Sequence, residues 1–168
     1  MLTPSGRKYI LLILVAGAVL AGDQATKLLV QARIPLYHAI PVIEGFFNLI
    51  HIHNPGGAFG FLAGQDPVLR AILFLAATVL AVGLLLVFFH RTPPGHPWLG
   101  TAFALILGGA LGNLVDRLRM GRVIDFLDVH VGRYHWPAFN LADSAITVGI
   151  GIFLVLMLSR RLPEDRRG

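Results

Sequence analysis

Long apolar runs alternate with polar segments along the chain. A helix that crosses about 30 Å of hydrocarbon needs about 20 mostly apolar residues. By this measure the pattern predicts four membrane-spanning helices, at about residues 9–30, 68–89, 98–117 and 139–159. The first run follows Arg7 and Lys8, as in a signal peptide, but it continues past Asp23 and three more runs follow it. We therefore interpret it as a retained span of a single membrane domain covering residues 1–168.

The segments between these runs differ in length and pattern. Residues 90–97 form a tight polar turn, whereas residues 31–67 and 118–138 are long connections. Apolar and polar residues alternate over 47–53, which favours a short strand. Four spans place both termini and the tight turn on one side of the membrane and the two long connections on the other.

Composition supports the membrane interpretation. The chain is 55% hydrophobic and 14% charged, whereas soluble domains carry about 25% charged residues. Its net charge is +5, but the basic residues flank apolar runs and form no polar face studded with aromatic residues, so we do not expect nucleic-acid binding. The absence of cysteine excludes disulfides, thiolate nucleophiles and cysteine-ligated metals. Arginines clustered beside the first and last spans predict that both termini are cytoplasmic.

In this arrangement, polar residues from separate parts of the chain lie at one depth, near the extracytoplasmic side of the membrane. Ionisable groups near membrane-embedded sequence are costly and by default suggest function. The residues concerned are Asp23, Asn113, Asp116, Arg117, Asp125, Asn140 and Asp143. Their convergence predicts a functional site at the extracytoplasmic ends of the spans.

Several of these residues also have a structural interpretation. Asp23 and Lys27 have the i, i+4 spacing of a helical ion pair. Asn113 and Arg117 share that spacing and could bond the backbone of a neighbouring loop. Asn140 and Asp143 have the spacing of a helix cap and its reciprocal partner three residues on, so capping alone would account for Asp143.

Asp125 has no such structural reason. It lies between Ile124 and Phe126 in a segment that we expect to be a loop. If Asp125 and Asp143 face each other, both cannot ionise cheaply, and the pair can share a proton and activate a water for amide hydrolysis. Because the start of a helix favours a charged carboxylate, we expect the resting proton mostly on Asp125.

Other chemistries are weaker candidates. His51 and His53 would point to one face of a strand, as zinc ligands do, but no convincing third ligand accompanies them, so we predict no metal. A small transporter or channel could line a polar path with charged residues. Its charges would step across the membrane and the chain would often show an inverted repeat, which we do not find. A structural scaffold would leave Asp125 unexplained.

Five segments in order resemble the lipoprotein signal peptidase (signal peptidase II) family. They are Asp23-Gln-Ala-Thr-Lys27, Asn54-Pro-Gly-Gly-Ala-Phe59, the stretch 108–117, Gly121-Arg-Val-Ile-Asp125-Phe126 and the stretch 137–144. Each segment alone is a weak signal, but together they are specific and extend over nearly the whole chain. One departure is Gly57, where the family usually has alanine.

The resemblance implies a bacterial inner-membrane aspartic endopeptidase. Its substrates would be diacylglyceryl-modified prolipoproteins, cut on the amino side of the lipidated cysteine. Asp125 and Asp143 would be the catalytic pair. The supporting residues would be Asp23, Lys27, Asn54, Gly56, Asn113, Arg117 and Asn140.

The same resemblance implies the fold and the partners. The fold would be an all-α membrane bundle of four transmembrane helices with a small extracytoplasmic β-cradle. The segment 31–67 would supply the cradle and a short interfacial helix. The enzyme would need no cofactor or metal, would act as a monomer, and would meet its substrates and membrane lipids within the bilayer.

Overall fold

The computed structural model describes residues 3–56 and 66–159. Its helices are α1 (Pro4–Arg33), α2 (Pro67–Arg91), α3 (Pro97–Met120) and α4 (Leu141–Leu158). Its strands are β1 (Ala39–Ile43), β2 (Phe47–Asn54), β3 (Val123–Val131) and β4 (Tyr134–His135). All four helices are long and apolar enough to cross a membrane. The predicted four-span fold with a small sheet is therefore confirmed.

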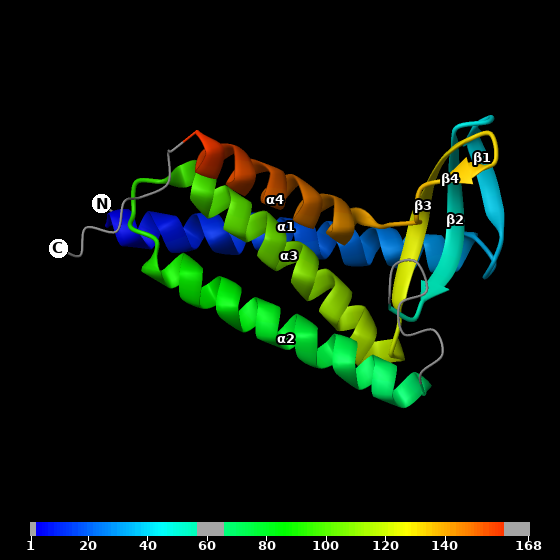
Figure 1. Cartoon of the computed structure of the whole chain (residues 1–168), viewed down its shortest axis with the longest axis horizontal. Coiled ribbons are helices and arrows are strands. Elements are labelled where there is room, and N and C mark those ends of the chain that lie inside the picture. Colours follow the sequence, from blue (N-terminus) through cyan, green and yellow to red (C-terminus); the bar gives the residue numbers. More distant parts are fainter. Residues whose placement is uncertain (1–2, 57–65, 160–168) are drawn as a thin grey trace.

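The bundle has two distinct ends (Figure 1). The start of α1, the turn between α2 and α3 and the end of α4 lie at one end, and the sheet lies at the other. This is the arrangement that the lengths of the connections predicted. The sheet and its connecting turns therefore extend beyond the helices at that end of the molecule.

Local sequence signals account for the helix boundaries. Three helices begin with a proline at the first position, at Pro4, Pro67 and Pro97, where a missing N–H costs nothing. The side chain of Asp66 caps α2 by accepting from two backbone N–H groups. Gly121 ends α3 in the left-handed conformation (φ 68°), which turns the chain directly into the sheet.

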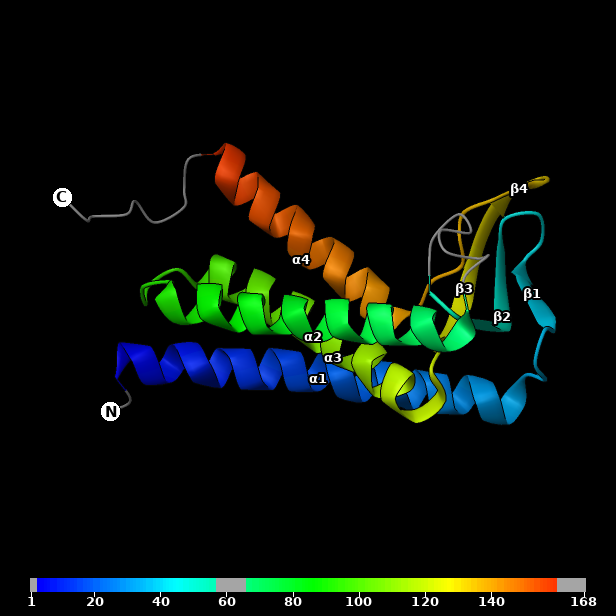
Figure 2. The same cartoon turned by 60° about the horizontal axis from the view of Figure 1, so that its bottom comes forward.

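Helix α3 lies between the other helices (Figures 1 and 2). In α3, 56% of the most apolar stretch is buried inside the protein, whereas in α2 the share is 6%. Helix α2 therefore exposes the largest share of its apolar stretch to lipid. A Cβ atom added at Gly108 would lie 2.7 Å from the carbonyl oxygen of Ala16 in α1, and one at Gly112 would lie 2.5 Å from Oδ2 of Asp23. The Gly-x-x-x-Gly spacing thus serves close packing within one chain.

The four-stranded sheet is antiparallel, with the strand order β1-β2-β3-β4. The strand expected from the alternation over 47–53 is present as β2. Asp125, which we expected in a loop, lies instead in β3, opposite Ile52 of β2. The β-branched and apolar residues that surround it, from Val123 to Val131, explain why this segment is a strand.

The interfacial helix expected within 31–67 is absent from residues 34–56, which contain strands and turns. Residues 57–65 of that segment, including Gly57, lie outside the described residues. The helix therefore stays a prediction.

The buried apolar residues form two clusters, and the smaller one fixes the sheet relative to the bundle. The larger lies among α1, α2 and α3, and its buried members are Leu12, Ala16, Phe89, Leu99, Phe103, Ala104 and Leu107. The smaller joins Val30 and Ile34 at the end of α1 to Phe126 in β3. Because Phe126 follows Asp125 directly, the smaller cluster holds that carboxyl group at the junction of sheet and bundle.

Candidate active site

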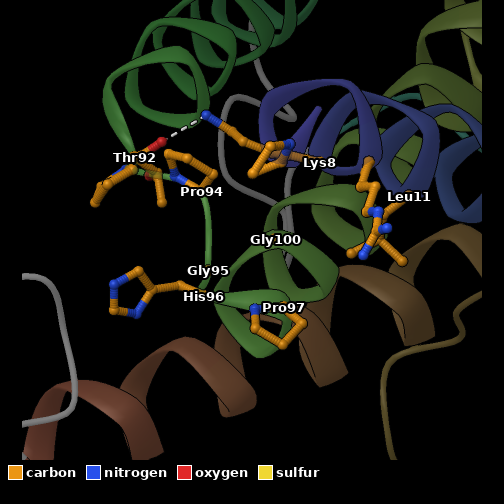
Figure 3. A pocket seen from close by; sticks show the side chains of 11 residues that line it. Lys8, Leu11, Thr92, Pro94, Gly95, His96, Pro97 and Gly100 are labelled. Carbon is orange, nitrogen blue, oxygen red and sulfur yellow. Dashed lines mark hydrogen bonds between the residues drawn. The ribbon is translucent and has the colours of Figure 1, made fainter. Parts of the chain in front are cut away.

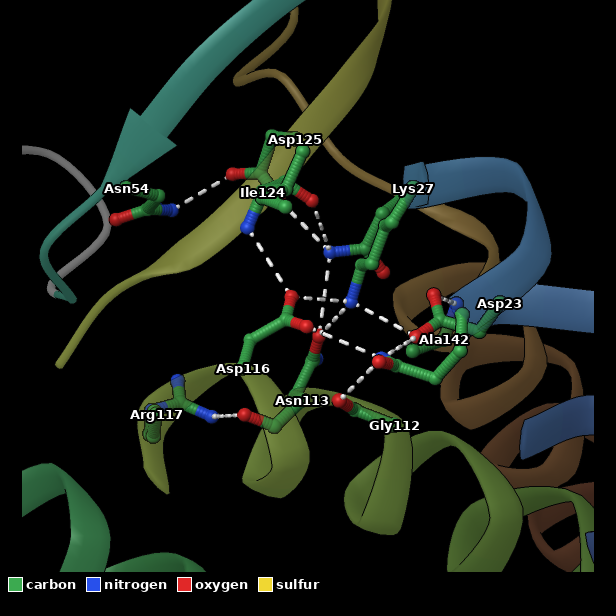
Figure 4. A network of polar contacts seen from close by, with 12 residues as sticks. Asp23, Lys27, Asn54, Gly112, Asn113, Asp116, Arg117, Ile124, Asp125 and Ala142 are labelled. Carbon is green, nitrogen blue, oxygen red and sulfur yellow. Dashed lines mark hydrogen bonds and ion pairs between the residues drawn. The ribbon is translucent and has the colours of Figure 1, made fainter. Parts of the chain in front are cut away.

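The carboxyl group of Asp125 is buried at this junction and is bonded by neutral amides (Figure 4). Its residue is 1% exposed. Its Oδ2 accepts a hydrogen bond from Nδ2 of Asn54 at 2.8 Å, and its Oδ1 accepts one from Nδ2 of Asn140 at 2.8 Å. Burial raises the pKa of Asp125 to about 6, and the nearby charge of Asp143 acts in the same direction, although the amide bonds oppose it. The carboxyl group can therefore hold a proton close to neutral pH.

Asp143 lies in the first turn of α4 and is half-buried. Its Oδ1 accepts from Nδ2 of Asn113 at 2.8 Å, and its Oδ2 accepts from the backbone N–H of Asn140 at 3.2 Å. The side chain of Asn140 accepts in return from the N–H of Asp143 at 2.9 Å, which confirms the predicted capping box. Asn140 thus bonds both carboxyl groups, that of Asp125 through its side chain and that of Asp143 through its backbone.

A second charged group surrounds Lys27 deeper in the bundle. The Nζ atom of Lys27 lies 2.8 Å from Oδ2 of Asp23 and 2.8 Å from Oδ2 of Asp116. It also donates to Oδ1 of Asn113 at 3.0 Å. The predicted ion pair within α1 is confirmed, and Asp116 joins it from α3. Because the three charged residues are at most 1% exposed, Lys27 pairs with both carboxylates almost without water.

The carboxylates of Asp23 and Asp116 also fix two backbone segments next to Asp125 and Asp143, which we call the acidic pair. Oδ1 of Asp23 accepts from the N–H of Ala142 at 3.0 Å, which anchors the start of α4 to α1. Oδ2 of Asp116 accepts from the N–H of Ile124 at 3.2 Å, which anchors β3 to α3. Asp125 and Asp143 are the next residues along the chain from these two anchors. The buried ion pairs therefore set the positions from which the two acidic side chains extend.

One member of this network, and the pairing of another, were not predicted from the sequence. Gln24 donates to Asp23 at 3.2 Å and to Asp116 at 3.0 Å; it lies in the first of the five family-like segments, but its spacing alone predicts neither contact. Asp116 was noted as a polar residue at this depth, but its pairing with Lys27 was not foreseen. Its position three residues after Asn113 places both side chains on one face of α3 and could have indicated it.

The remaining predicted residues lie at the edge of the site. The N–H of Gly56 donates to Oδ1 of Asn54 at 2.9 Å. Gly56 has φ +96°, and an added Cβ would overlap the ring of Phe74 in α2, so only glycine fits there. Arg117 is half-buried and donates to the carbonyl oxygen of Asn113 at 3.4 Å, with its guanidinium 6.0 Å from the centroid of the same Phe74 ring. All nine predicted residues are thus gathered in one region.

The histidine pair is close to this region but has few partners. The rings of His51 and His53 have centroids 5.3 Å apart, and Nδ1 of His51 bonds the carbonyl oxygen of Ile34 at 2.8 Å. Within residues 3–56 and 66–159, no three His, Cys, Asp or Glu side chains are grouped as a metal site requires. That the chemistry needs no metal stays a prediction.

Fold and site together define a multi-pass membrane protein whose buried carboxyl groups gather at one end of a four-helix bundle. The model of the Signal peptidase (SPase) II family matches residues 15–159. The chain therefore belongs to the signal peptidase II family, a family of membrane peptidases, and the resemblance seen in the sequence is confirmed.

Individual relatives agree with this assignment. The chain is 48% identical to the lipoprotein signal peptidase of Desulforapulum autotrophicum over 94% of this chain and 98% of that protein. It is 50% identical to the lipoprotein signal peptidase of Nitratidesulfovibrio vulgaris over 96% of each. Among solved structures, a bacterial membrane enzyme determined by the in meso method at 2.3 Å resolution superposes with a TM-score of 0.79 and 30% identity, covering 94% of this chain and 93% of that one.

Proposed function

We propose that Asp125 and Asp143 are the catalytic pair with which this peptidase removes the signal peptide from prolipoproteins. The activity follows from the family and from the relatives, which are lipoprotein signal peptidases. One observation carries the assignment of the pair: Asn140 bonds both carboxyl groups, and their other partners among the described residues are neutral amides. Neutral donors leave the pair free to exchange a proton, as general acid–base hydrolysis requires.

In the proposed mechanism the two carboxyl groups begin with one proton between them. Asp143 is ionised and takes a proton from a water molecule, whose oxygen attacks the carbonyl carbon of the scissile peptide bond. Asp125 donates its proton to the carbonyl oxygen, which gives a neutral tetrahedral intermediate. When the carbon–nitrogen bond breaks, Asp143 passes its proton to the leaving nitrogen and the intermediate returns a proton to Asp125. The pair is then restored.

The substrate that fits this site carries lipid. We infer that the protein cleaves diacylglyceryl-modified prolipoproteins on the amino side of the lipidated cysteine and does so as a monomer, since both carboxyl groups come from one chain. The acidic pair lies where the apolar helices end and the sheet begins. At such a junction the acyl chains can stay in the bilayer while the peptide bond meets water.

The cleavage assay that tests this proposal uses a purified protein and a precursor peptide with and without the diacylglyceryl group. Asp125→Asn and Asp143→Asn should each abolish cleavage of the lipidated peptide. Asp128→Asn is the matched control, because Asp128 lies in the same strand but bonds Asn48 and His135 and neither member of the pair. Cleavage at the wild-type rate by either Asn variant of the pair would refute the assignment. Equal cleavage of the two peptides would refute only the lipid requirement.

We also propose that the sheet end of the molecule is extracytoplasmic and that both termini are cytoplasmic. Exposed basic residues at the other end, among them Arg7 and Arg91, support this orientation. The natural chain has no cysteine, so the labelling of a single introduced cysteine can be measured without background. In intact cells an impermeant thiol reagent should label Arg133→Cys in the turn before β4 and should not label Pro94→Cys. The reverse pattern would overturn the orientation.

The transporter alternative is not favoured by the relatives or by the distribution of charge. Asp23, Arg117 and Asp125 all lie at the sheet end of the bundle. The other half of the bundle contains the larger apolar cluster. The described charges therefore form no path across the membrane.

A further inference from the structure

A cavity of about 390 Å³ lies at the end of the bundle opposite the acidic pair (Figure 3). It is enclosed by the start of α1, the turn between α2 and α3 and the first turn of α3. Arg7 and Lys8 supply positive charge, Thr92 and His96 supply polar groups from the turn, and Leu11 and Gly100 contribute to an apolar wall. The proposed peptidase activity uses none of these residues.

The two basic residues of this cavity, Lys8 and Arg7, differ in the contacts that they make. The Nζ atom of Lys8 donates to the carbonyl oxygen of Thr92 at 2.6 Å and to that of His90 at 3.3 Å, and it lies 4.4 Å from the ring centroid of Phe89. An ammonium group has three donors, so one remains for a ligand. The described part of the chain gives the exposed guanidinium of Arg7 neither a hydrogen-bond nor an ion-pair partner.

Two helix starts add to this positive potential. Helices α1 and α3 both begin beside the cavity, and Pro4 and Pro97 at their first positions are among its lining residues. The cap residue of α3, His96, makes no capping hydrogen bond through its side chain, so the first turn of that helix keeps unbonded N–H groups. The carboxylates of residues 3–56 and 66–159 do not offset it, because all of them belong to the opposite half of the molecule.

We propose that this cavity binds the phosphate group of an anionic phospholipid, with Arg7 and Lys8 as its ligands. Free phosphate has the same charge, but two features favour a lipid. The cavity lies at the ends of helices that are long enough to span the bilayer, which is the depth of the headgroups. Its apolar wall at Leu11 continues one turn further into Leu14, which is 66% exposed and offers a path for an acyl chain.

Lipid binding to the purified full-length protein tests the proposal without reference to cleavage. Phosphatidylglycerol and phosphatidylcholine are titrated in neutral detergent, and bound lipid is counted by native mass spectrometry. Phosphatidylglycerol should bind more tightly, and Arg7→Gln should weaken its binding at least about tenfold, because it removes a hydrogen bond between two charged groups. Arg91→Gln is the matched control, because it removes the same charge from the same end outside the cavity, and it should change the affinity less than twofold.

Three outcomes would overturn the proposal. Equal affinity for the two lipids would show that the cavity does not select an anion. Equal weakening by Arg7→Gln and Arg91→Gln would show that binding reflects diffuse charge and no defined site. Displacement of phosphatidylglycerol by millimolar inorganic phosphate would assign the cavity to the free ion. Because Arg7 is exposed, its variant should fold, and retained cleavage by that variant would establish this.

Discussion

Two pairs of carboxylates lie side by side at the junction of bundle and sheet, and the structure stabilises them differently. Asp23 and Asp116 share the ammonium group of Lys27 at 2.8 Å each. Asp125 and Asp143 have amide partners and no cation within ion-pair distance in the described residues. One ammonium group bonds both carboxylates of the first pair, whereas neutral amides position the second pair and leave its protonation free to change.

Asn113 connects the two pairs. Its Oδ1 accepts from Lys27 at 3.0 Å, and its Nδ2 donates to Asp143 at 2.8 Å. The amide can make both contacts only in one orientation, because the oxygen must face the ammonium group. The ion pairs thereby fix the direction from which the amide approaches Asp143.

The largest expected effects distinguish the two pairs, because mutations in Asp125 and Asp143 should lower the cleavage rate and a mutation in Asp116 should lower stability. Asp125→Asn should lower the cleavage rate about 10²–10⁴-fold, as loss of a general acid or base does, while stability stays equal or rises slightly. Asp143→Asn should lower the rate similarly and cost about 0.3–1 kcal/mol of stability through the helix dipole. Asp116→Asn should act mainly on stability. Cleavage rates and thermal unfolding of all three purified variants check this, and a purely structural loss in Asp125→Asn would contradict it.

Lys27→Met should produce the largest loss of stability. The substitution leaves Asp23 and Asp116 buried without their cation, and breaking a buried ion pair from one side costs about 3–5 kcal/mol. Arg33→Met, at the exposed end of the same helix, is the matched control and should change stability by less than about 0.5 kcal/mol. Thermal unfolding in detergent provides the comparison, and similar midpoints for the two variants would show that the ion pairs contribute little.

The raised pKa of Asp125 predicts a distinct pH dependence. A carboxyl group with a raised pKa in the folded protein binds its proton more tightly there than in the unfolded chain. Its contribution to stability is therefore present below the ordinary value of 3.8 and is lost as the pH rises through about 6. The unfolding midpoint of the wild type should fall relative to that of Asp125→Asn over this interval. The cleavage rate should decline over its upper part, as Asp125 loses the proton that it donates. A constant difference between the two midpoints would contradict the assignment.

A smaller effect distinguishes two arginines near the end of α3. Arg117 is half-buried beside the site and Arg119 is exposed on another face. Arg117→Ala should therefore lower cleavage or stability more than Arg119→Ala does. Equal rates and equal unfolding midpoints would show that Arg117 has no role in the site.

The smallest effect is expected at the histidine pair. His51→Ala and His53→Ala should each retain substantial cleavage, and cleavage should survive a strong chelator, because we assign these residues no metal. Loss of activity with chelator and its recovery on addition of zinc would show that cleavage uses a metal mechanism in place of the acidic pair.

Local spacing was sufficient to predict the contacts that lie within one helix. The ion pair of Asp23 with Lys27 and the capping box of Asn140 with Asp143 each join residues three or four positions apart. Contacts between elements were beyond such reasoning. The bond from Asn54 to Asp125 spans 71 positions and depends on the pairing of β2 with β3, which in turn required recognising β3 as a strand. The resemblance to a family named both residues, but it did not give their geometry.

The bonds of Asp23 bear on how the protein enters the membrane. Its bond to the N–H of Ala142 joins residues 119 positions apart, so it can form only after nearly the whole chain has been made. Its bond to Lys27 lies within one helical turn and is available as soon as α1 forms. The first helix therefore reaches the bilayer with its buried acid already neutralised. Helix α1 can therefore stay in the bilayer with no net charge at the depth of Asp23 and Lys27 until α4 is inserted and completes the site.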